Sequence, residues 1–150
     1  MNARIFALAA PLLLACGSPR STYDFVLSDG GRVSDRDASG LVDNTGILAI
    51  DDAAWHLGMT LGGLAEGTHQ SVSVTIIDKT NARILSTEQG GSCSVFVDPH
   101  GSTNGSAISG HFTCTALGDG HGNTVDVNGV EFLTYISDAA NNPSSDPPHP

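Results

Sequence analysis

Residues 92–115 read SCSVFVDPHGSTNGSAISGHFTCT, and this stretch decides the fold class. Apolar and polar residues alternate on both sides of a middle rich in glycine, serine and asparagine, which is the pattern of two half-buried β-strands joined by a turn. Cys93 shares the more apolar face of the first run with Val95, and Cys114 shares that of the second run with Phe112. The stretch therefore predicts an antiparallel hairpin in which Cys93 lies opposite Cys114 and Val95 lies opposite Phe112.

The same alternation continues on both sides of this hairpin. The runs 55–61 and 71–78 each place their large apolar side chains on one face, and turns rich in Gly, Asn and Asp separate such runs. Eight or nine short strands are therefore expected, over 23–28, 46–50, 55–61, 71–78, 82–87, 92–97, 108–115, 124–127 and 130–133.

The last two of these strands are expected to form a tight hairpin. Residues 124–133 read TVDVNGVEFL, and Asn128-Gly129 favours a two-residue turn because both of its central positions need a positive φ. Such a turn would pair Val127 with Val130. Elsewhere only 51–55 is expected to form a helical turn.

Antiparallel strands with one buried and one solvent-exposed face predict an all-β protein. A β-sandwich of about eight strands over 23–136 is favoured, and a small β-barrel is the alternative. From 137 to 150 the sequence reads SDAANNPSSDPPHP, which has no large apolar residue, so a disordered tail is expected. The expected core residues are Phe25, Leu27, Ile50, Trp55, Leu57, Met59, Leu61, Val72, Val74, Ile76, Val95, Val97, Phe112, Val125, Val127 and Phe132.

Residues 1–15, MNARIFALAAPLLLA, are expected to be a secretory signal segment. Arg4 supplies the positive charge that precedes the apolar core of a signal peptide. The eleven uncharged residues 5–15 are long enough for such a core and too short to cross a bilayer as a helix. The mature chain would then begin at Cys16, with 16–22 as a short tether before the folded domain.

The residues Leu13-Leu14-Ala15-Cys16 resemble a bacterial lipobox. The resemblance implies cleavage before Cys16, a diacylglycerol thioether on its sulfur and an acylated new N-terminus. An ordinary signal peptide that contains a cysteine is the alternative. Together with the small strands and the cysteine pair, the lipobox makes the chain similar to the many small, uncharacterised bacterial lipoproteins with β-sandwich ectodomains. That resemblance implies a lipid-anchored place in the bacterial envelope, on the outer membrane or the periplasmic face, and carries over no binding site.

If Cys16 carries lipid, Cys93 and Cys114 are left to pair as a disulfide, which persists in exported proteins. Two free buried thiols and a metal site are the alternatives, although no C-x-x-C or paired Cys/His spacing occurs. A catalytic thiol is not expected, because both cysteines lie within strands rather than at a helix N-terminus.

The charge of the chain excludes one class of partner. Only 6 residues are Lys or Arg against 16 Asp or Glu, which gives a formal net charge of −10. Nucleic-acid binding needs a basic face to contact phosphates, so no nucleic-acid partner is expected. The expected partners are the membrane, through the N-terminal lipid, and an envelope protein or a glycan.

No cofactor and no metal site are expected. Residues 119–126 resemble an EF-hand loop at first, but His121 and Thr124 break its pattern and the glutamate is missing. Acidic residues gather again over 35–52, where weak calcium binding is the alternative to a solvated surface. The six histidines are spread over strand faces, loops and the tail with no metal-ligand spacing.

No catalytic site is expected either. The chain has no G-x-S-x-G motif and no phosphate-binding loop, and only 5% of its residues are aromatic, the usual surface for stacking sugars. Trp55 falls on the same strand face as Leu57 and is therefore expected in the core. Stacking of its ring on a ligand is the alternative. The leading hypothesis is a non-enzymatic binding or structural module whose loops 98–106 and 117–123 form the contact surface. A small secreted hydrolase or metal-dependent enzyme, and a barrel carrier of an apolar ligand, are the alternatives.

Overall fold

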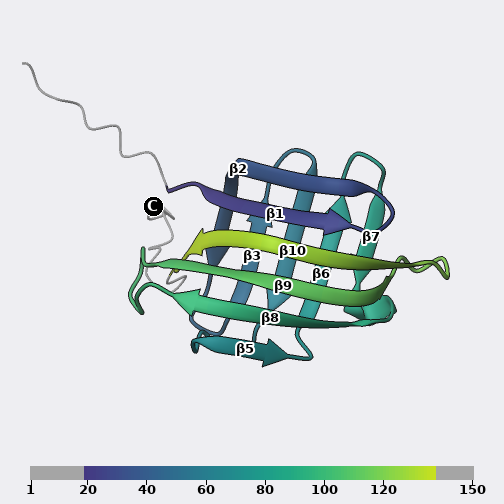
Figure 1. Cartoon of the computed structure of the whole chain (residues 1–150). Coiled ribbons are helices and arrows are strands. Elements are labelled where there is room, and N and C mark those ends of the chain that lie inside the picture. Colours follow the sequence, from purple (N-terminus) through teal and green to yellow (C-terminus); the bar gives the residue numbers. More distant parts are fainter. Residues whose placement is uncertain (1–18, 138–150) are drawn as a thin grey trace, which may run out of the picture.

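The computed structural model describes residues 19–137, which form ten β-strands and one short 3-10 helix (Figure 1). Among these residues there is no α-helix, and no helix is long and apolar enough to span a bilayer. The strands are β1 (Ser21–Leu27), β2 (Gly31–Val42), β3 (Ile47–Asp51), β4 (Trp55–Thr60), β5 (Gly67–Gln70), β6 (Ser73–Asp78), β7 (Arg83–Ser86), β8 (Ser92–Pro99), β9 (Ala107–Gly118) and β10 (Thr124–Tyr135), with the 3-10 helix at Thr87–Gln89.

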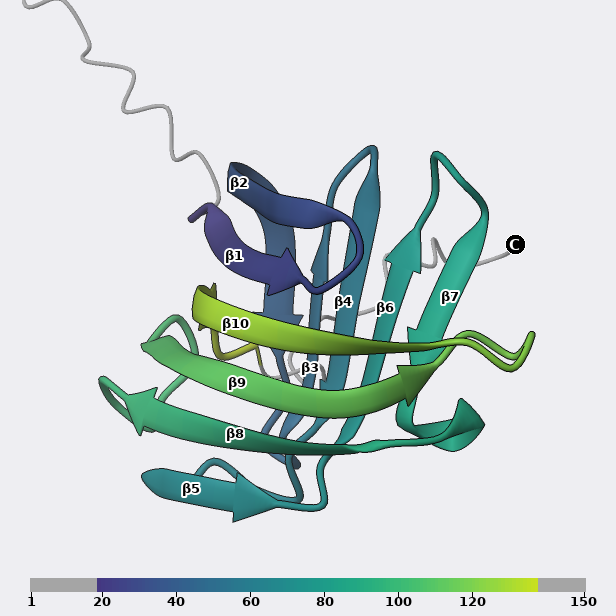
Figure 2. The same ribbon diagram turned by 45° about the vertical axis from the view of Figure 1, so that its right-hand side comes forward.

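Eight of the strands close into a ring in the order β10, β1, β2, β3, β4, β6, β7 and β9, since β9 also pairs with β10. All strand pairs in this ring are antiparallel, and β8 and β5 extend it beyond β9. Figures 1 and 2 show two packed layers. The front layer holds β1, β10, β9, β8 and β5, the back layer holds β3, β4, β6 and β7, and their strands cross at a steep angle.

The expected all-β antiparallel class is confirmed. The two layers resemble the favoured sandwich, but backbone pairing joins them at both edges, so the closed barrel given as the alternative describes the hydrogen bonding. On one edge the link is the single pair of Ser86 with Gly118. On the other edge it is β2, which pairs with β1 over 31–38 and with β3 over 39–42.

β2 is absent from the strands expected from the sequence. Its twelve residues, GRVSDRDASGLV, are mostly solvent-exposed, and only Ala38 and Val42 are buried. A strand that passes from one layer to the other leaves much of both faces in water, so it lacks the alternation that reveals a half-buried strand. The short β5, which contains His69, was also not expected.

The expected core is confirmed almost completely. Every residue of that set is buried except Trp55, which is partly buried and packs against the core. Phe25 lies at its aromatic centre, with ring centroids 5.6 Å from those of Tyr23 and Trp55 and 6.3 Å from that of Phe112. These large side chains fill the barrel interior, so an apolar ligand carried there would have to displace them.

The hairpin of β8 and β9 has the predicted register. Cys93 lies opposite Cys114, and Val95 lies opposite Phe112. The sulfur atoms of the two cysteines are 2.01 Å apart in a disulfide, and both residues are buried. The predicted pairing of these two cysteines is therefore confirmed.

The predicted turn at Asn128-Gly129 is wrong. Both residues lie inside the continuous strand β10, and neither has a positive φ. Gly129 lies under the ring of Phe112, because a Cβ on this glycine would be 2.1 Å from the Cδ1 atom of that ring. The glycine therefore provides room for an aromatic ring, which an Asn-Gly signal does not distinguish from a turn.

Two smaller boundaries also differ from expectation. Residues 51–55 form no helical turn: Asp52 lies in a tight turn and its carboxylate accepts the backbone N–H groups of Ala54 and Trp55, at 2.5 and 2.7 Å. β1 begins at Ser21, inside the segment expected as tether. The expected signal segment, Cys16 and the expected tail beyond Ser137 lie outside the described residues.

Candidate functional site

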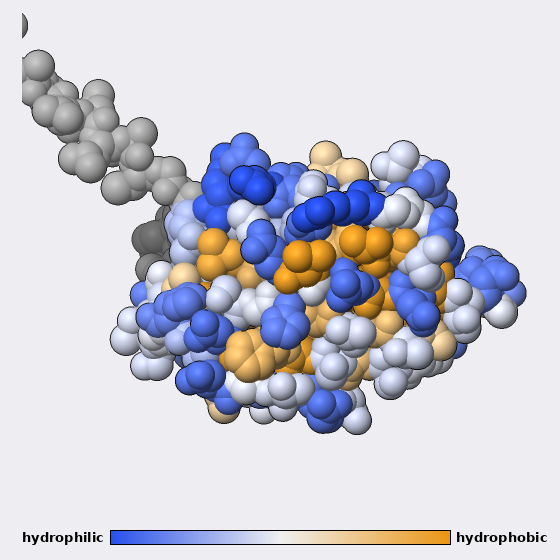
Figure 3. Space-filling model, viewed as in Figure 1, coloured by the Kyte–Doolittle hydropathy of each residue, from blue (hydrophilic) through white to orange (hydrophobic). Residues whose placement is uncertain are grey.

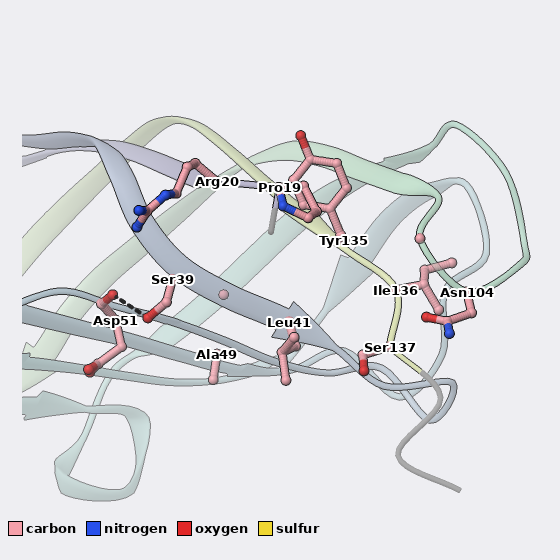
Figure 4. Close-up of a pocket in the computed structure, with 12 residues that line it drawn as sticks. Pro19, Arg20, Ser39, Leu41, Ala49, Asp51, Asn104, Tyr135, Ile136 and Ser137 are labelled. Carbon is pink, nitrogen blue, oxygen red and sulfur yellow. Dashed lines mark hydrogen bonds between the residues drawn. The ribbon is translucent and has the colours of Figure 1, made fainter. Parts of the chain in front are cut away.

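A groove of about 790 Å³ lies where the described chain begins and ends (Figure 4). Pro19 and Arg20 approach it from the N-terminal side, and the end of β10 with Ser137 closes the other side. Its lining residues are Pro19, Arg20, Ser39, Gly40, Leu41, Ala49, Asp51, Asn104, Gly105, Tyr135, Ile136 and Ser137. We call it the chain-end groove.

Backbone contacts fix the floor of the chain-end groove. The N–H of Ser137 donates to the carbonyl of Val42 at 2.9 Å, and the N–H of Gly105 donates to that of Ile136 at 2.8 Å. Gly40 allows Ser21 of β1 to lie close to β2, since a Cβ on this glycine would be 2.5 Å from the Oγ of Ser21. The groove is thus held by four parts of the chain that are far apart in sequence.

One side of the chain-end groove is apolar and the other is polar. Leu41 and Ala49, which face each other across β2 and β3, are exposed. On the polar side the hydroxyl of Ser39 donates to the backbone carbonyl of Asp51 at 3.0 Å, as the dashed line in Figure 4 marks. Arg20 lies at the rim and is exposed.

The Asp51 side chain connects this groove to a charged cluster. Its Oδ1 is 2.8 Å from the Nζ of Lys79 and 3.0 Å from the Nδ1 of His56. The hydrogen bond from Lys79, with a smaller contribution from His56, holds the pKa of the Asp51 carboxyl below its usual range. The groove therefore has a carboxylate on its wall that is already paired with a cation.

A second acidic arrangement lies at the start of the neighbouring turn. The Tyr23 hydroxyl donates a hydrogen bond to the carboxylate of Asp52. Burial raises the pKa of the Asp52 carboxyl, but the hydrogen bonds from Tyr23 and from the backbone of Trp55 and Ala54 outweigh it and hold the pKa below its usual value. Burial and the adjacent carboxylate raise the pKa of Tyr23 far above its ordinary value. Asp52 thus holds a turn against the core.

The predicted contact surface of loops 98–106 and 117–123 is wrong as a single surface. The two loops flank opposite ends of β9, whose twelve residues separate them by about 35 Å. Asn104 and Gly105 of the first loop line the chain-end groove. Asp119 and His121 of the second loop belong to a different hollow at the far end of the barrel.

This second hollow, which we call the far-end hollow, measures about 420 Å³. Its lining comes from the β6–β7 turn, the start of β7, the 3-10 helix and the β9–β10 loop. The polar lining residues are Asn81, Arg83, Gln89, Asp119 and His121, and the others are Ala82 and Ile84. The Nη2 of Arg83 is 2.6 Å from the Oδ2 of Asp29, so its guanidinium is paired with a carboxylate. The hollow offers amide, guanidinium, imidazole and carboxylate groups within one small surface.

The front layer also has apolar groups at its surface, interspersed with polar ones (Figure 3). A shallow hollow of about 440 Å³ there is lined by residues that include Phe96, His111, Val130 and Leu133. The ring of Phe96 stacks on that of His111 with centroids 5.2 Å apart. His111 is exposed on this face of the front layer.

Aspartates of the acidic stretches stabilise turns by accepting hydrogen bonds from backbone N–H groups. Asp119 accepts the backbone N–H groups of His121 and Asn123 at 2.8 and 3.1 Å, and Asp43 accepts those of Thr45 and Ile47 at 2.9 and 2.8 Å. Within residues 19–137, no three His, Cys, Asp or Glu side chains are grouped so that they could hold a metal ion.

The sequence predicted neither the chain-end groove nor the far-end hollow, although the loops 98–106 and 117–123 that it named each contribute residues to one of them. The chain-end groove depends on β2 and on the crossing of β10 past Val42, and neither leaves a local pattern. The exposed Leu41, an apolar residue in a polar stretch, was the one available signal. Comparisons of the chain with family models, curated proteins and solved structures find no match.

Proposed function

We propose that this protein is exported and anchored by lipid at Cys16 in the bacterial envelope, where it acts as a non-enzymatic binding module. The observation that carries the proposal is the placement of the three cysteines. Cys93 and Cys114 pair with each other, which suits an exported protein. Cys16 follows an apolar signal-like run and lies three residues before Pro19, the first described residue of the barrel.

The binding surface is assigned to the far-end hollow. It lies at the opposite end of β9 and β10 from the chain-end groove, because Gly118 pairs with Thr124 near the hollow and Ala107 pairs with Tyr135 near the groove. In an anchored protein this end points away from the membrane. Amide, imidazole and guanidinium groups side by side suit the hydroxyl groups of a glycan, so an envelope glycan is the proposed ligand.

The anchor is tested by replacing Cys16 with serine in cells that export the protein. The wild-type protein is expected in the membrane fraction, with the mass of a diacylglyceryl, N-acylated cysteine. The Cys16→Ser variant is expected to lose at least about nine-tenths of its membrane association, because no lipid remains to hold an acidic domain at a membrane. Ser18→Ala in the same segment is the control and should stay membrane-bound. An unlipidated wild-type N-terminus would contradict the anchor.

The ligand is tested with purified envelope polysaccharides and peptidoglycan sacculi. His121→Ala and Gln89→Ala are each expected to weaken glycan binding at least about fivefold, since each removes a hydrogen-bonding group from the far-end hollow. Asn104→Ala, in the loop at the opposite end, is the matched control and should bind like wild type. Binding that is equal in all four proteins, or absent from wild type, would overturn the assignment.

A further inference from the structure

Three of the four large exposed apolar side chains in the described residues lie on the outer face of one layer. Leu41 on β2 is 60% exposed, Ile47 on β3 is 54% exposed and Ile84 on β7 is 51% exposed, while Val130 is on the front layer. Leu41 and Ile47 lie beside Ala49, which pairs with Leu41 and lines the chain-end groove. We call Leu41, Ile47 and Ala49 the apolar face.

The residue rows that run from the apolar face across the back layer carry no charge, and two carboxylates border the face: the Oδ1 of Asp43 accepts the N–H of Ile47 at 2.8 Å, and Asp51 ends β3 two residues after Ala49. Across the back layer the residue row of Leu41 and Ala49 continues through Gly58, Thr75 and Ser86. The parallel row from Ile47 continues through Thr60 and Ser73. The rows themselves are therefore uncharged, and of the two bordering carboxylates Asp51 is paired with Lys79 at 2.8 Å.

The covalent chain limits how far this face can lie from the anchor. Cys16 and Pro19 are three residues apart, so their Cα atoms are separated by at most about 11 Å. Pro19 lines the same groove as Leu41 and Ala49. The exposed guanidinium of Arg20 lies at the groove rim, where its Nε is 3.6 Å from the Oδ1 of Asp37.

We propose that the apolar face rests on the lipid bilayer that holds the anchor, with Leu41 and Ile47 at the boundary between headgroups and acyl chains. The inference depends on the proposed lipid anchor and adds an orientation to it. Two side chains give too little apolar area to bind a membrane alone. A tether of a few residues supplies a high effective concentration, so a weak contact is enough to orient the barrel.

The other occupants of this face are less suitable. The residues after Ser137 read DAANNPSSDPPHP, which offers no large apolar side chain and adds two aspartates. A second copy of the chain would bring another strongly acidic domain against this one. Lipid is the occupant that matches both the apolar side chains and the position of the anchor.

The test uses the full lipidated protein, purified from membranes and placed in vesicles of phosphatidylcholine and phosphatidylglycerol at four to one. Ala49→Cys and Thr113→Cys each introduce one free thiol for an environment-sensitive fluorophore, because Cys16 is blocked and the other two cysteines are paired. Thr113 is the matched control, since it is exposed on the front layer. Brominated lipids are expected to quench the fluorophore at position 49 at least about twofold more than at position 113.

A second variant tests whether quenching at position 49 depends on the exposed apolar side chains and not on the attached fluorophore. Leu41→Glu with Ile47→Glu, two exposed positions whose exchange leaves the core intact, is expected to reduce the quenching at position 49 to that at 113. Equal quenching at both positions, or self-quenching between labelled copies in place of lipid quenching, overturns the orientation. Vesicle binding by the lipidated protein would survive either result, whereas a missing lipid on Cys16 would refute the anchor itself.

Discussion

Loss of the Cys93–Cys114 disulfide is expected to lower the free energy of unfolding by about 3 kcal/mol, because the bond closes a loop with a sequence separation of 21 residues and restricts the unfolded chain. In a domain of this size that corresponds to a melting temperature lower by about 10 °C. The measurement is urea and thermal unfolding of the protein with and without a reductant, and of a Cys93→Ala, Cys114→Ala double variant.

The double variant also serves as the control for the reductant. Reduction should destabilise the wild-type protein to about the level of the double variant and leave that variant unchanged. The single variant Cys93→Ala should be no more stable than the double variant, since it leaves a thiol in the core. A decrease below about 1 kcal/mol on reduction would contradict the role given to this bond.

The β8–β9 hairpin could be predicted in detail because two independent signals agreed there. Alternation set which residues face the core, and the turn-forming residues between the runs set the register. Cys93 and Cys114 then fell on the same face at the same level, as the structure has them. Likewise the buried positions of β4 and β6 followed from alternation alone.

The barrel closure could not be predicted, because it rests on a strand without a buried face. β2 contributes only Ala38 and Val42 to the core and joins two layers, so its sequence has the polar character of a loop. Without β2 the remaining strands suggest two separate sheets. The two end hollows share this origin, since each combines segments that are distant in sequence.

The Asn128-Gly129 pair shows a different limit. A glycine marks either a backbone that needs a positive φ or a place where another group comes too close for a Cβ. The local sequence is the same in both cases. Only the partner across the strand, Phe112 opposite Gly129, decides between them.

Gly129→Ala is therefore expected to destabilise the barrel by at least about 2 kcal/mol, measured by urea unfolding. The added Cβ would lie 2.1 Å from the Phe112 ring, and that ring is buried, so it can move only by disturbing the core. Combining Gly129→Ala with Phe112→Leu should recover much of the loss, because a smaller side chain leaves room for the methyl group.

The substitution Asn128→Thr distinguishes between a glycine that makes room for a ring within a continuous strand and a glycine that forms a turn. Asn128 is exposed within β10, where a β-branched residue fits an extended backbone, so its effect should stay within about 0.5 kcal/mol. In a two-residue turn the same position would need a positive φ, and threonine would be strongly unfavourable there. A large loss for Asn128→Thr, or additive effects of Gly129→Ala and Phe112→Leu, would show that the glycine serves the backbone and not the ring above it.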